Sequence, residues 1–166
     1  MAYTMITSRS TMLTAAFDRL DLGSIGIAAT ALAANLQLGD CIVLAGPLAA
    51  GKTTFVQALA KALGEVDEIT SPTFTLAHFH TNGRLPLLHI DAYRLESSHS
   101  FTDLALDDFY ETHVTAIEWG EKFINSLPES YRVELVPDGE DTRRLIVSAP
   151  AQKDENLEKI SRALGR

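Results

Sequence analysis

A segment with glycine at both ends of a short loop follows an apolar run in the first third of the chain. Residues 46–54 read Gly-Pro-Leu-Ala-Ala-Gly-Lys-Thr-Thr, which matches the pattern G-x-x-x-x-G-K-[S/T]. The apolar residues 41–45 precede it and the helix-like residues 53–63 follow it. This strand, loop and helix setting is the one in which the pattern binds phosphate. The segment therefore predicts a nucleotide-binding α/β protein, with a solvated surface turn as the alternative.

The residue types of this loop suit phosphate chemistry. Glycines at both ends let backbone N–H groups wrap closely around an anion at the start of a helix. Lys52 should reach the β- and γ-phosphates, the hydroxyl of Thr53 should ligate Mg²⁺, and Thr54 should support the helix. The expected nucleotide-binding residues of the loop are Gly46, Pro47, Leu48, Ala49, Ala50, Gly51, Lys52, Thr53 and Thr54.

Composition limits the class of protein. A chain of 166 residues with 46% apolar residues can form one domain around one core. Its formal charge of −8 argues against unaided tight binding to nucleic acid, which needs a basic face. The apolar stretch at residues 25–36 is too short to cross a bilayer, and we expect neither a signal peptide nor membrane binding. The single cysteine, Cys41, is expected in the core, and the location is expected to be cytoplasmic.

Periodicity and turn residues divide the chain into three parts. Residues 1–21 are a leader of uncertain order or a short added strand, residues 22–150 are the domain, and residues 151–166 are a C-terminal amphipathic helix or tail. Ser24 is the expected N-cap of the first helix, and the pair Asn82-Gly83 predicts a β-hairpin. The patterns predict helices at residues 24–38, 53–63, 102–110 and 153–164, and strands at 41–45, 74–80, 85–90, 114–117, 132–136 and 144–148.

This order of elements predicts an α/β fold. We expect a single-domain P-loop NTPase with a central, mostly parallel sheet, a β-hairpin insertion and helices on both faces. Ligands of such sheets bind at the carboxyl ends of the strands. The candidate site should therefore lie where the predicted strands end.

Two acids follow predicted strands at that edge. Asp91 and Glu118 could both hold Mg²⁺ or order the attacking water, although Asp91 could instead cap a turn and Glu118 could be a surface carboxylate. Thr73, in a polar loop, could sense the γ-phosphate, and Trp119 could stack on the nucleotide or only pack in the core. The five histidines lack the spacing of a zinc site.

Four ordered motifs, at residues 46–54, 71–76, 89–95 and 117–121, resemble the bacterial TsaE family. The resemblance covers residues 22–148. It implies an ATPase of tRNA threonylcarbamoyladenosine biosynthesis, with ATP and Mg²⁺ as ligands and weak turnover in isolation.

The resemblance also implies roles and partners. Lys52 and Thr53 would bind phosphate and Mg²⁺, and Asp91 and Glu118 would organise metal and water. Thr73 would belong to a switch loop and Trp119 would lie by the nucleotide. ATP hydrolysis would drive or reset the tRNA-modifying complex. Its partners would be the TsaD-like transferase subunit and the TsaB-like companion, and tRNA would be met only through them.

One residue departs from the family pattern, because Ala49 stands where the family usually has glycine. A left-handed backbone at this position would be strained by alanine. Two other functions stay open: a small-molecule kinase of the P-loop class, and a nucleotide-dependent interaction module without turnover. A GTP switch is disfavoured, because no Asn-Lys-x-Asp sequence occurs.

Overall fold

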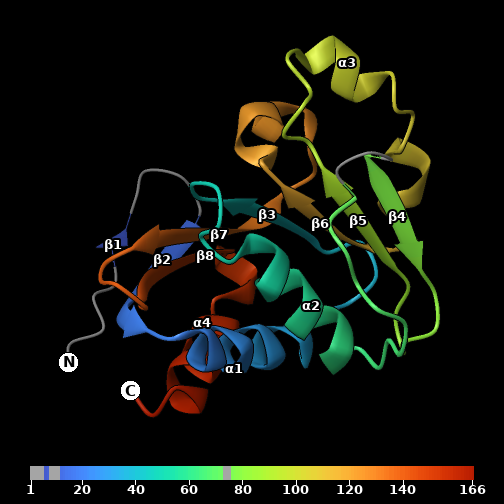
Figure 1. Cartoon of the computed structure of the whole chain (residues 1–166). Coiled ribbons are helices and arrows are strands. Elements are labelled where there is room, and N and C mark those ends of the chain that lie inside the picture. Colours follow the sequence, from blue (N-terminus) through green and yellow to red (C-terminus); the bar gives the residue numbers. More distant parts are fainter. Residues whose placement is uncertain (1–5, 8–11, 73–75) are drawn as a thin grey trace.

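A mixed sheet of eight strands forms the middle of the protein. The computed structural model describes residues 6–7, 12–72 and 76–166, and the strands lie in the order β1-β2-β8-β7-β3-β6-β5-β4 (Figure 1). The strands are β1 (Ile6–Thr7), β2 (Met12–Leu20), β3 (Cys41–Ala45), β4 (Ala77–His80), β5 (Leu87–Asp91), β6 (Val114–Glu118), β7 (Ser130–Pro137) and β8 (Arg143–Pro150). The helices are α1 (Leu22–Ala33), α2 (Lys52–Ala62), α3 (Ser98–Thr102) and α4 (Glu155–Ala163), with 3₁₀ segments η1 (Asp107–Phe109), η2 (Gly120–Ser126) and η3 (Ala151–Lys153).

The four central strands are parallel and the outer ones are antiparallel. Strands β7, β3, β6 and β5 run in the same direction. Four of the seven pairings among the described strands are nevertheless antiparallel. A mostly parallel sheet is therefore not confirmed, because β4–β5 and β7–β8 are joined by turns too short for the crossover that parallel neighbours need. The hairpin predicted around Asn82-Gly83 is confirmed as β4–β5.

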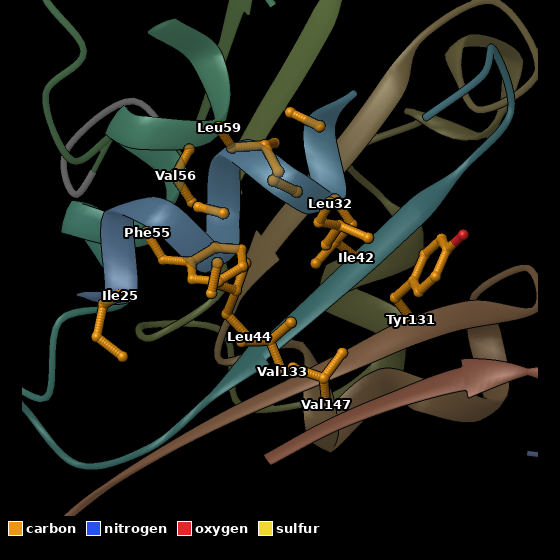
Figure 2. Packing of buried hydrophobic residues seen from close by; sticks show 14 of the residues in the cluster. Ile25, Leu32, Ile42, Leu44, Phe55, Val56, Leu59, Tyr131, Val133 and Val147 are labelled. Atoms are coloured by element: carbon orange, nitrogen blue, oxygen red, sulfur yellow. The ribbon is translucent and has the colours of Figure 1, made fainter. Parts of the chain in front are cut away.

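Helices cover both faces of the sheet, as expected. In Figure 1, α1, α2 and α4 lie on one side and α3 on the other. Helices α1 and α2 pack on the larger core (Figure 2), and α4 adds Leu157 and Ile160 to it. On the other face, α3 and η2 cover a second core, where the ring centres of Phe101 and Phe123 lie 4.8 Å apart in a stacked arrangement. The larger core includes Ile25, Leu32, Ile42, Leu44, Phe55, Val56, Leu59, Tyr131, Val133 and Val147.

Residues 12–20 belong to the sheet. Strand β2 pairs with β8 from Met12 to Leu20, and the side chain of Phe17 is buried in the larger core. The segment 1–21, expected to be a leader or a short added strand, thus contributes a nine-residue strand. Local sequence patterns did not predict this strand, because its pairing partner lies more than a hundred residues away.

Helix α1 begins earlier than its pattern indicates. Asp21, and not Ser24, is the N-cap, because its carboxylate accepts a hydrogen bond of 2.8 Å from the backbone N–H of Ser24. The helix then buries positions at helical spacing, and it ends at Ala33 rather than near residue 38.

The helix expected at residues 102–110 does not form. Helix α3 ends at Thr102, and Ala105 has a left-handed backbone with φ of 52°. A left-handed residue interrupts a right-handed helix, so the following segment forms only the short η1. The predicted strands 114–117, 132–136 and 144–148 and the C-terminal helix are confirmed as β6, β7, β8 and α4. Among the described residues, no helix has the length and hydrophobicity needed to cross a membrane.

The burial of β2 leads to a stability prediction. Phe17→Ala should lower the free energy of unfolding by about 3–5 kcal/mol, because it leaves a cavity in the larger core. The matched control is Phe79→Ala on edge strand β4, where the side chain is 46% exposed and a clearly smaller loss is expected. Urea denaturation of both variants checks this, and equal losses would contradict a structural role for residues 12–20.

Candidate active site

Two glycines shape the loop between β3 and α2. Gly46 has a φ of 138°, and a side chain there would collide with the carbonyl oxygen of Leu135 on β7. Gly51 has a φ of 109° immediately before α2 begins. Both positions therefore require glycine. The loop turns sharply enough to place the N-terminus of α2 against its interior, where backbone N–H groups attract anions.

Ala49, between these glycines, has a left-handed backbone with φ of 60°. Such a conformation costs alanine about 1–2 kcal/mol. The suspected strain at this position is therefore present in the loop.

The ammonium of Lys52 lies inside the loop. Its Nζ donates hydrogen bonds to the carbonyl oxygens of Gly46, at 2.7 Å, and Pro47, at 2.8 Å. The same Nζ lies 4.0 Å from the centre of the Trp119 ring, a favourable cation–π distance. Only 5% of Lys52 is exposed.

Burial and the neighbouring negative charges shift the pKa of Lys52 in opposite directions. Desolvation lowers the pKa of its ammonium, while the negative charges of Glu118, Glu121 and Asp91 raise it. The hydrogen-bond acceptors of the ammonium are neutral carbonyls, which bind a cation less strongly than an anionic oxygen does. Lys52 is thus a buried cation suited to an anionic ligand.

Thr53, Glu118 and His89 form one chain of hydrogen bonds. The hydroxyl of Thr53 donates to Oε1 of Glu118 at 2.8 Å. The other oxygen, Oε2, lies 2.6 Å from Nε2 of His89. Both Glu118 and His89 are buried. The parallel pairing of β5 with β6 brings His89 and Glu118 together. Thr53 reaches them from the start of α2, which follows β3, the other parallel neighbour of β6.

Asp91 lies beside Glu118 in the register of β5 and β6. Its Oδ2 accepts a hydrogen bond from the hydroxyl of Ser71 at 3.0 Å, and its Oδ1 accepts one from the backbone N–H of Tyr93 at 3.0 Å. Asp91 therefore caps the turn after β5 and also faces the site. The two interpretations of its position, turn former and site residue, both hold geometrically.

Trp119 closes one side of the site. It has a left-handed backbone with φ of 63°, and its ring lies 5.0 Å from that of Tyr93. Lys122 donates a hydrogen bond of 3.2 Å to the carbonyl oxygen of Tyr93. Trp119 thus lies on the cavity wall and also packs against the second core.

These residues surround a cavity of about 310 Å³. Most of the predicted site residues contribute to its wall. Gly46, Pro47 and Ala50 belong to the loop but not to the wall. Thr73 lies outside the described residues. The wall consists of Leu48, Ala49, Gly51, Lys52, Thr53, Thr54, Ser71, Asp91, Tyr93, Glu118 and Trp119.

Comparison with known proteins agrees with this geometry. The family model described as threonylcarbamoyl adenosine biosynthesis protein TsaE matches residues 23–146. The chain belongs to the TsaE family. The match includes the phosphate loop, both site acids and Trp119, so the resemblance seen in the four motifs is confirmed.

Individual TsaE proteins match over much of their length. The tRNA threonylcarbamoyladenosine biosynthesis protein TsaE of Bacillus subtilis is 37% identical over 133 residues, which cover 78% of this chain and 83% of that protein. The TsaE protein of Treponema pallidum is 53% identical over 96 residues, or 57% of this chain and 70% of that one. The crystal structure of YdiB from Bacillus subtilis has a TM-score of 0.76 and 26% identity, covering 92% of this chain and 97% of that one.

The oxygen-bearing side chains of this site have the donor chemistry that a magnesium ion prefers. The Thr53 hydroxyl and the carboxylates of Asp91 and Glu118 line the same cavity, and Mg²⁺ is usually held by one or two carboxylates together with substrate phosphates. Within the described ranges, no group of three or more His, Cys, Asp or Glu residues is placed to hold a metal ion by itself.

Four contributors to the site were not identified from the sequence: Ser71, His89, Tyr93 and Arg143. Arg143, from β8, donates a hydrogen bond of 3.1 Å from Nε to the carbonyl oxygen of Ala50 and braces the loop. Strand alternation could have identified His89 from the sequence, because it lies two residues before Asp91 on the same strand and therefore on the same face.

The strain at Ala49 leads to a second prediction. Ala49→Gly should raise the free energy of unfolding by up to about 1 kcal/mol, since relief of the left-handed strain exceeds the entropy cost of glycine. Nucleotide affinity should also rise. Ala50→Gly is the matched control, because Ala50 has no positive φ and should lose stability. Chemical denaturation of both variants checks the pair, and equal destabilisation would refute strain at Ala49.

Proposed function

We propose that this TsaE protein is a P-loop NTPase that binds ATP with Mg²⁺ and hydrolyses it. The observation that carries the proposal is the convergence of a buried lysine, a threonine hydroxyl and two carboxylates on one cavity beside a glycine-shaped loop. Phosphoryl transfer needs positioning and electrostatic stabilisation more than covalent chemistry. Each of these groups can supply one of those two effects.

Lys52 supplies the mobile positive charge. Its ammonium leaves the neutral carbonyls of Gly46 and Pro47 for phosphate oxygens, because charge-assisted hydrogen bonds are roughly twice as strong as neutral ones. The low exposure of the lysine strengthens this attraction, since little water screens it. Backbone N–H groups at the start of α2 add further donors to the phosphates.

Thr53, Glu118 and Asp91 are the proposed metal-site residues. Bound Mg²⁺ would neutralise charge that develops on the phosphates. Glu118 has both oxygens engaged, so it orients the Thr53 hydroxyl and keeps that hydroxyl's lone pairs available to the metal. Asp91 and Ser71 line the same wall and are placed to order metal-bound or attacking water.

The family indicates the process in which this hydrolysis is used. We propose that the chain acts in the biosynthesis of threonylcarbamoyladenosine in tRNA, in the cytoplasm, and that its ATP cycle drives or resets the transferase complex. The TsaD-like subunit and its TsaB-like companion are the proposed partners. A net charge of −8 fits contact with tRNA through those partners rather than directly.

Turnover with and without the partners tests this function. Phosphate release should be slow for the isolated chain and should rise when the transferase subunit and its companion are added, because closure of a site by a partner lowers the barrier. Unchanged turnover in the full assembly would contradict the proposed cycle. Fast, partner-independent transfer of phosphate to a small-molecule acceptor would instead establish a kinase.

Lys52→Ala should reduce ATP turnover by about 100-fold or more, because the phosphates lose their buried cation. The protein should remain folded, since the contacts of the ammonium within the described part of the chain are with two loop carbonyls and the Trp119 ring. Lys61→Ala, on the exposed side of the same helix, is the matched control and should retain wild-type turnover. A folded Lys52→Ala variant with normal turnover would exclude the phosphate-loop role.

Asp91→Asn and Glu118→Gln should each impair Mg²⁺-dependent turnover more than they lower the melting temperature. Both amides keep the size of the side chain but remove the charge that favours the metal. Turnover over a range of Mg²⁺ concentrations, with melting curves of the same samples, separates the two effects. A large loss of stability with unchanged activity of the folded fraction would assign the acids to capping.

A further inference from the structure

His89 is a buried histidine directly beneath the site. None of its surface is exposed, and it does not contribute to the cavity wall. Its Nε2 lies 2.6 Å from Oε2 of Glu118, while its Nδ1 has no hydrogen-bond partner among the residues that the structure describes. A buried polar atom without a partner costs stability. The stability of the fold therefore does not explain a histidine at this position.

The neighbours of His89 on β5 and β6 are apolar, whereas its cross-strand partner on β4 is His78. Alternation along the strands places Leu87 on its face of β5, with Val114 and Ala116 on the same face of β6. All three belong to the larger core. An apolar residue at position 89 would satisfy this environment without leaving a nitrogen unpaired. Packing alone therefore does not account for a histidine here.

The contact with Glu118 indicates whether Nε2 of His89 donates or accepts a hydrogen bond. A carboxylate accepts hydrogen bonds, so the ring donates from Nε2. Glu118 is consequently held at both ends, by His89 at Oε2 and by Thr53 at Oε1.

We propose that His89 is a positioning residue that fixes Glu118 for the metal-binding hydroxyl of Thr53. With Oε2 held, the carboxylate cannot rotate away, and Oε1 stays in place to accept the Thr53 proton. The lone pairs of that hydroxyl would then be available to hold Mg²⁺. Partners that hold the groups around a metal in this way affect metal affinity although they never touch the metal. The inference rests on the proposed Mg-ATP site.

Exchange of His89 for an apolar or an amide residue tests this role. His89→Leu removes the donor, and it should lower turnover about 10- to 100-fold without lowering the melting temperature. His89→Gln keeps an N–H donor at similar reach and should retain most of the activity. A histidine needed only for structure would show the reverse, with lost stability and normal turnover per folded molecule.

Metal binding gives a readout that is independent of turnover. Calorimetry of ADP binding with and without Mg²⁺ should show that His89→Leu loses the gain in affinity that Mg²⁺ gives the wild type, while binding of metal-free ADP is unchanged. The matched control is Thr115→Val. Thr115 is also fully buried, with a hydroxyl that lacks a partner among the described residues, and its replacement should leave both binding constants unchanged.

A double-mutant cycle identifies the residue through which His89 acts. In a Glu118→Gln background, His89→Leu should cause little further loss, because its effect passes through the carboxylate. Independent, multiplicative losses would overturn the inference, and so would a His89→Leu variant with wild-type turnover and Mg²⁺ dependence. If both His89→Leu and His89→Met fail to fold, a purely structural role is established instead. Failure of the wild type to bind Mg-nucleotide would refute the proposed function itself.

Discussion

The parallel pairing of β6 with β3 and β5 is the constraint on which the site depends. In this register, Glu118 lies opposite Leu44 on one side and Asp91 on the other. Strand β3 ends at Ala45, the residue after Leu44, and the phosphate loop begins there. The loop and both acids therefore meet at one edge of the sheet. A shift of the register by one residue would turn the acids to the opposite face.

The local parts of this arrangement could be predicted from the sequence. The strand Cys41–Ala45, the phosphate loop and helix α2 follow one another with strong signals, since apolar runs and glycines act over short distances. The positions of Asp91 and Glu118 at strand ends followed from the general rule for α/β sheets. The possible strain at Ala49 was also anticipated, and its φ of 60° bears it out.

Contacts between distant segments could not be predicted in this way. The pairing of β2 with β8 and the contact of His89 with Glu118 depend on how the strands associate, which no local pattern encodes. The capping of α1 is local, because Asp21 caps the helix through Ser24, three residues on, and aspartate and serine are both favoured at an N-cap. Ala105 broke an expected helix although alanine favours helices, because tertiary packing overrides propensity. The missed pairing of β2 with β8 and the missed contact of His89 with Glu118 join segments that lie far apart in the chain.

We propose that nucleotide phosphates enter the cavity beside Lys52, and the fluorescence of Trp119 would report their entry directly. Trp119 is the only tryptophan, and the Lys52 ammonium lies 4.0 Å from its ring centre. Titration of the wild-type chain with Mg-ADP should change its emission in a saturable way, because the ammonium is drawn toward the phosphates. The change should vanish in Lys52→Ala. Constant emission of the wild type, under conditions where calorimetry shows that the nucleotide is bound, would place the nucleotide elsewhere and contradict the account.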